Sequence, residues 1–184
     1  MRTKNFFAGL LMTLASALSA SCLAAPITYT ISGTASGTLG GTAFQEKAFQ
    51  AVALGDTDAR IPIDVGVYVL ALQSVDVTVD GVGSGLAVNA FSFFVNQPLS
   101  EVGLIENLSG DVLDVSSSAL AAYDGISSLA GTPVANDFMS SFSTTGGLFA
   151  LDTASNLLFS ARRVTAKQIY RRLYGKFSNP RNLC

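Results

Sequence analysis

The chain has 184 residues, of which 49% are hydrophobic and only 13% are charged, and it contains no histidine. A chain this apolar is not disordered throughout, and its length suits one domain with its own core. The lack of histidine excludes Ser-His-Asp triads, Cys-His dyads, His-ligated zinc and HExxH peptidases. The two cysteines, Cys22 and Cys184, lie near the two ends, so the body between them has no disulfide and no catalytic thiol.

The net charge of −2 conceals an uneven distribution. All 13 acidic residues lie between Glu46 and Asp152, where the only bases are Lys47 and Arg60. Most of the 11 basic residues follow from Arg162 onward. The body is therefore acidic and the tail basic, which indicates either an interaction tail or a junction of unrelated sequence.

Residues 1–24 are predicted to form a secretory signal peptide. Two bases open the segment, and the apolar run over 6–18 is too short to span a bilayer. Small residues follow, and we expect cleavage between Ala24 and Ala25. A lipid anchor on Cys22 is the alternative, but a serine stands three positions earlier, where such an anchor needs a Leu-like residue.

After the leader, apolar residues recur at every second position, which is typical of strands. Ile27, Tyr29 and Ile31 alternate with Thr and Ser residues. The Gly/Ser/Thr-rich segment 33–41 predicts a turn or a bulged strand, and 44–54 predicts a second strand.

Three further strands are expected over 63–72, 74–80 and 86–95. The first is apolar on nearly both faces and is predicted to be buried, whereas the other two alternate. The expected inward side chains of the alternating strands are Val75, Val77, Val79, Val88, Phe91, Phe93 and Val95.

The middle of the chain has a different character. Residues 98–114 mix glycines with acids and predict long loops, and 116–129 predicts a short helix that Ser116 or Ser117 would cap. Short closing strands are expected over 138–143, 148–151 and 156–160. Strands at this spacing with Gly-rich turns predict a mainly β domain over 25–161, an antiparallel β-sandwich of about eight strands with one short helix.

Residues 162–184 form a basic tail without a single acid. Its apolar residues fall at helical spacing, so the tail predicts a short basic amphipathic helix that makes weak contact with an anionic membrane. Nucleic acid attracts the same charge, but no motif for specific nucleic-acid recognition is present. A reading-frame disruption is the alternative origin of the abrupt change.

Asp56 and Asp58 are the metal candidates of the chain. Carboxylates suit calcium, a common ion outside cells, but the spaced set of ligands of a calcium loop is missing. A solvated turn is the favoured interpretation, and no cofactor is expected.

Carboxylates are also the only residues available for acid–base hydrolysis, which needs a pair about 5–10 Å apart. Asp76 and Asp80 share one face of a strand but are about 13 Å apart by strand rise. Asp111 and Asp114 are interpreted as solvated loop residues, and Phe138, like Phe91 and Phe93, as a core residue.

The segments ITYTISGTASGTLGGTAF (27–44), AAYDGISSL (121–129) and TGGLF (145–149) resemble exported Gram-negative bacterial proteins that carry a PEP-CTERM sorting signal. The resemblance implies export and association with surface or matrix polysaccharide, and it brings no catalytic residue with it. Residues 162–184 lack the Pro-Glu-Pro motif, apolar span and terminal Arg cluster of that signal.

The sequence as a whole therefore predicts an exported, non-enzymatic protein that is secreted, periplasmic or held at the cell surface. Its expected role is structural, adhesive or carbohydrate-binding, with surface polysaccharide or an envelope protein as partner. The alternative is a carboxylate-dependent polysaccharide hydrolase, which requires two carboxyl groups close together in one cleft.

Overall fold

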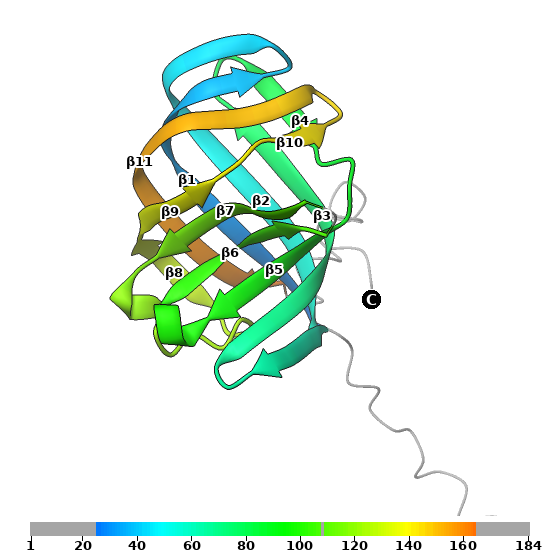
Figure 1. Cartoon of the computed structure of the whole chain (residues 1–184), viewed down its shortest axis with the longest axis vertical. Coiled ribbons are helices and arrows are strands. Elements are labelled where there is room, and N and C mark those ends of the chain that lie inside the picture. Colours follow the sequence, from blue (N-terminus) through cyan, green and yellow to red (C-terminus); the bar gives the residue numbers. More distant parts are fainter. Residues whose placement is uncertain (1–24, 108, 165–184) are drawn as a thin grey trace, which may run out of the picture.

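The computed structural model describes residues 25–107 and 109–164, which form a single antiparallel sheet of eleven strands (Figure 1). The predicted signal peptide, and the predicted tail beyond residue 164, lie outside the described residues. The strands are β1 (Pro26–Leu39), β2 (Thr42–Asp64), β3 (Val67–Val79), β4 (Gly83–Leu86), β5 (Phe91–Asn96), β6 (Glu101–Glu106), β7 (Gly110–Ser116), β8 (Leu129–Pro133), β9 (Ala135–Met139), β10 (Phe142–Thr144) and β11 (Gly147–Arg163).

The predicted mainly β, antiparallel fold is confirmed, but with eleven strands rather than about eight. Two of the additional strands, β6 and β7, lie where 98–114 predicted loops. These strands were missed because acids and glycines interrupt their alternation of apolar residues. The segments 63–72 and 74–80, by contrast, were predicted as two strands, and most of their residues belong to the single strand β3.

Strands β8 and β9 follow one another directly and bridge the two ends of the sheet. The path runs β10-β11-β1-β2-β3-β5-β6-β7-β9, and β8 pairs with β11 while β9 pairs with β7. The sheet therefore curls round on itself, and Figure 1 shows β5, β6 and β7 in front of β1 and β2. The predicted two layers correspond to the facing halves of this one continuous sheet.

The core lies between these halves. The alternation in β1 and β3 is confirmed, because Tyr29 and Val77 are buried while their sequence neighbours are more exposed. The ring of Phe93 stacks on Tyr29 at a centroid distance of 3.7 Å and parallel to Phe159 at 5.9 Å. One aromatic column therefore joins β1, β5 and β11, strands that are far apart in sequence.

The predicted helix over 116–129 is reduced to a single 3₁₀ turn, η2 (Ser118–Leu120). Beyond it, Oδ1 of Asp124 accepts hydrogen bonds from the N–H groups of Ile126 and Ser127, at 3.0 and 2.8 Å. Gly125 adopts a φ of 78°, outside the helical range. A helix is not formed because the aspartate side chain holds the N–H groups that helical bonding would need.

Four large apolar residues predicted to be inside lie outside, and most of the segment 63–72, which was predicted to be buried, is at least partly exposed. Ile63 and Val65 are exposed because β2 and β3 form a hairpin that ends in a turn at residues 65–66. Val88 is exposed because it leaves the sheet after β4, and its N–H bonds to the carbonyl of Ser143 at 3.1 Å. Phe138 is exposed because the register of β9 directs its side chain to the outer face.

Among the described residues, no helix combines the length and the apolar character that crossing a membrane requires.

Candidate functional site

The metal candidates Asp56 and Asp58 lie in β2, where the strand departs from its pairing with β3. Oδ1 of Asp56 accepts a hydrogen bond of 2.9 Å from the N–H of Asp58, so this carboxylate caps a local turn. Within residues 25–107 and 109–164, no three Asp, Glu, Cys or His side chains are grouped so that they could hold a metal ion. The described structure adds no further ligand to this pair.

A different set of carboxylates meets on the outer face of β6, β7 and β9, directed away from the core. The residue at its centre is Asp114 of β7, which projects outward because Leu113 and Val115 point into the core. It pairs with Gly103 of β6 and with Phe138 of β9, so the three lie in one row across the sheet. The carboxylates that act electrostatically on one another are Glu101, Asp111, Asp114 and Asp137, termed the carboxyl cluster.

Gly103 makes room for the central carboxylate. A Cβ at this position would lie 2.5 Å from Cε1 of Phe94 and still closer to Oδ1 of Asp114. Real Cβ atoms do not approach neighbours this closely, so any larger residue would have to displace one of them. The glycine therefore sets the carboxyl of Asp114 against the backbone and beside a phenylalanine ring.

Asp114 is held in an environment that disfavours its charge. The residue is only 4% exposed, and its Oδ1 has no hydrogen-bond partner among the described residues. Burial, with the negative charges of Asp111, Glu101 and Asp137, raises the pKa of Asp114 to about 8. At neutral pH the group is mostly a neutral carboxylic acid, which avoids an uncompensated buried charge.

Glu101 and Asp137 form a second, linked pair within the cluster. Burial, a hydrogen bond with Asp137 and the charges of Asp137 and Asp111 raise the pKa of Glu101 to about 7. Two carboxyl groups can share a hydrogen bond only when one of them carries a proton. Every charged group that acts on Glu101 or Asp114 within the described structure is acidic, so the cluster has no built-in counter-ion.

Phe138 places an accessible aromatic ring at the edge of this cluster. It is 45% exposed and lies directly across from Asp114. Asp137 is the extra residue at the bulge where the β7–β9 register shifts, and it is exposed beside the ring. The face therefore combines an apolar ring with carboxyl groups, two of them buried and two accessible.

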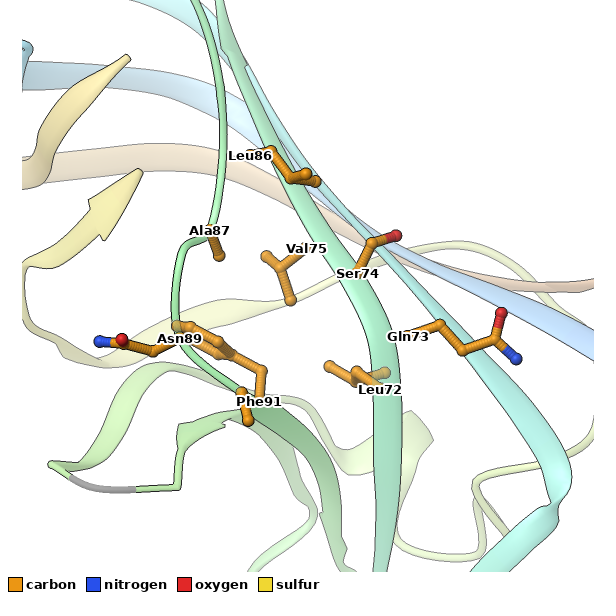
Figure 2. Close-up of a pocket in the computed structure, with 9 residues that line it drawn as sticks. Leu72, Gln73, Ser74, Val75, Leu86, Ala87, Asn89 and Phe91 are labelled. Atoms are coloured by element: carbon orange, nitrogen blue, oxygen red, sulfur yellow. The ribbon is translucent and has the colours of Figure 1, made fainter. Parts of the chain in front are cut away.

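A hollow of about 220 Å³ opens elsewhere, where β3 parts from the segment between β4 and β5. Figure 2 shows Leu72, Val75 and Ala87 directed into the opening, whereas the amides of Gln73 and Asn89 point away from it. The Asn89 amide also donates to Oε1 of Glu106. The hollow is lined by apolar and neutral residues and brings no titratable group to a ligand.

A second hollow, of about 240 Å³, borders the loop that follows η2 and contains one carboxylate, Asp124. Hydrogen bonds tie this loop to β1 and β2, and the loop covers one end of the core. Tyr29 Oη donates to the carbonyl of Gly125 at 2.6 Å, and Nη1 of Arg60 donates to that of Asp124 at 2.9 Å. Burial strongly raises the pKa of Tyr29 and of Tyr123, so both remain neutral phenols with a packing role.

Comparison of the chain with protein-family models, with curated proteins and with solved structures found no match.

Sequence reasoning missed the carboxyl cluster because Asp111 and Asp114 were assigned to a solvated loop. The signal that could have identified it is the alternation around Gly103, where Val102 and Leu104 point inward. Once β6 and β7 are read as neighbouring strands, their acids fall on the same outer face.

Proposed function

We propose that this protein is an exported surface or matrix protein that binds carbohydrate on the outer face of β6, β7 and β9. The observation that carries the proposal is the exposed ring of Phe138 directly across the strand pair from Asp114 and next to Asp137. Aromatic rings stack on the apolar faces of sugars, and a few placed polar groups then fix the orientation of the ligand. The proposed role is structural or adhesive and involves no catalysis.

Export is part of the same proposal, supported by the three-part leader and by the resemblance to PEP-CTERM proteins. β1 begins at Pro26, so cleavage between Ala24 and Ala25 would remove none of the described strands. Mass spectrometry of the protein from its native host should find a chain that begins at Ala25. A chain retaining the leader inside cells would contradict export.

The binding face is tested with a glycan array and the full chain. Phe138→Ala should weaken binding of any glycan captured by about ten-fold, because stacking on one ring contributes about 1–2 kcal/mol. The matched control is Leu148→Ala, which removes a comparably exposed apolar side chain, 51% accessible, from β11. Equal loss in both variants, or no glycan captured by the parent, would contradict the proposal.

The second candidate is a carboxylate-dependent hydrolase, favoured by the high pKa of Asp114 beside other carboxylates. A protonated acid near an ionised carboxylate is the arrangement that glycoside hydrolysis uses. Asp114→Asn should then abolish release of reducing ends from a polysaccharide substrate, while Asp76→Asn, at an exposed site on β3, should not. No release by the parent protein over long incubation removes this candidate.

The basic tail is proposed to add weak contact with anionic membranes. Its first two residues, Arg162 and Arg163, pair with Thr28 and Ile27 at the end of β11. Removing residues 165–184 should therefore leave the sheet intact and reduce co-sedimentation with anionic vesicles, most clearly at low salt. Unchanged co-sedimentation would exclude the tail as the contact.

A further inference from the structure

We infer that the ligand of the carboxyl-cluster face carries amino groups: it is a carbohydrate chain with free amines, such as a glucosamine oligomer, rather than a neutral or N-acetylated one. This inference rests on the proposed function and specifies its ligand class.

The carboxyl-cluster face is acidic. The cluster brings four carboxyl groups into electrostatic contact, and within the described structure no basic group offsets them. The described bases lie elsewhere: Lys47 lies in β2, Arg60 contacts the loop after η2, and Arg162 and Arg163 end β11. A ligand that supplies positive charge fits this face better than a neutral one.

The second step is the central carboxyl. Asp114 is 96% buried, and its Oδ1 lacks a hydrogen-bond donor, although three other carboxylates act on it. Such a group marks a position whose hydrogen-bond donor is missing from the described residues. An ammonium held by the accessible carboxylate of Asp137, which lies at the bulge beside Asp114, would supply positive charge next to this carboxyl.

The third step is the ring of Phe138, which selects a sugar over a bare cation. An exposed aromatic face attracts an ammonium group through its quadrupole and also packs against the C–H face of a pyranose. A chain of amine-bearing sugars presents both features side by side. A lysine-rich peptide offers only the first, so it should bind more weakly.

Binding of this ligand is coupled to proton release. The positive charge favours the ionised carboxyls, so Asp114 and Glu101, whose pKa values are raised, give up protons to the buffer as the ammonium binds. The ammonium keeps its own proton, and no covalent bond changes. The other charged group that faces these carboxyls from β6, β7 or β9 is Asp111, which is also acidic.

The test is calorimetric titration of the full chain at mildly acidic pH, where the glucosamine amines are protonated and Asp114 is still neutral, with three probes: a glucosamine hexamer, an N-acetylglucosamine hexamer and a hexalysine peptide. The glucosamine hexamer should bind about ten-fold or more tighter than either, since one extra ion pair with desolvated carboxylates contributes at that level. Its apparent enthalpy should differ between two buffers of different ionisation heat, reporting released protons.

Two variants locate the effect. Asp137→Asn should reduce the preference for the amine-bearing hexamer and the number of protons released, whereas Asp76→Asn, an exposed acid on β3, should change neither. Equal affinity for both hexamers on the Phe138 face would overturn this inference and leave the proposed function intact. Equal or tighter binding of hexalysine would overturn the sugar specificity. No binding of the glucosamine hexamer would overturn this inference, whereas the proposed function would be contradicted only if the array also captured no glycan.

Discussion

The two halves of the curled sheet differ in how exposed the residues on their outer face are. In β1 and β3, apolar residues point to the core and most outward positions are polar and at least partly open to water, as at Thr30 and Asp76. In β5, β6 and β7, most residues are buried whichever face they are on, including Glu101 and Asp114. Outward acids of β3 such as Asp76 are therefore solvated, whereas Asp114, on an outward position of β7, is buried and mostly protonated.

The largest expected effect lies where both halves share the core. Phe93→Ala removes a ring that is 1% exposed and stacks on Tyr29 and Phe159. The free energy of unfolding should fall by about 3–5 kcal/mol, because the cavity can close only partly. Urea denaturation measures this. A loss within the error of the measurement would mean that the two halves do not share one core.

The next effect compares an enclosed glycine with a glycine that has open space around it. Gly103→Ala should lower the free energy of unfolding by about 1–3 kcal/mol, because the new Cβ meets Asp114 and Phe94. The matched control is Gly131→Ala in β8, where a Cβ has no neighbour within 4 Å. Equal melting temperatures of the two variants would contradict the tight packing of the outer face.

A third effect on stability depends on pH. Asp114 has a folded pKa of about 8, whereas its unfolded value is near 3.8, so as pH rises the unfolded chain loses this proton first. Between about pH 4 and 8 the free energy of unfolding should therefore fall, by at most about 1.4 kcal/mol per pH unit from this group. Urea denaturation across this range should show a shallower slope in Asp114→Asn, with Glu101 still titrating, and an unchanged slope in the control Asp76→Asn. Equal slopes in all three proteins would refute the buried acid.

The smallest effect on stability is expected at Phe138. Because the ring is 45% exposed, Phe138→Ala should change the free energy of unfolding by less than about 1 kcal/mol while weakening glycan binding. Differential scanning fluorimetry and the array together test this. A large loss of stability would show that the ring serves packing more than recognition.

The sequence predicted the first half well because its strands follow a simple rule. Ile27, Tyr29 and Ile31 alternate with polar residues, and the structure buries them. In the second half, the strand predicted over 86–95 is confirmed as β5, whereas β6 and β7 were not predicted, because Gly103 and Asp114 occupy outward positions that are nonetheless enclosed. Burial on both faces depends on which strands become neighbours, and that is fixed by pairings such as β7 with β9, not by local periodicity.

The candidate site escaped for the same reason. Asp111 and Asp114 could be noted as acids, but their approach to Glu101 and Asp137 requires three strands in register. Phe138 was predicted as core because an aromatic residue in an apolar strand is usually buried. The bulge at Asp137, which no sequence rule predicts, sets the register that places this ring outside.

Asp114 is kept neutral beneath the outer face of β6, β7 and β9, to which we propose that a positively charged ligand binds. Carbon-13 NMR of the side-chain carboxyl groups, titrated with and without the glucosamine hexamer, tests it most directly. The account predicts a midpoint near 8 for Asp114 in the free protein and a shift to lower pH when the hexamer is bound. A midpoint near the ordinary value of 3.8, unmoved by the ligand, would contradict it.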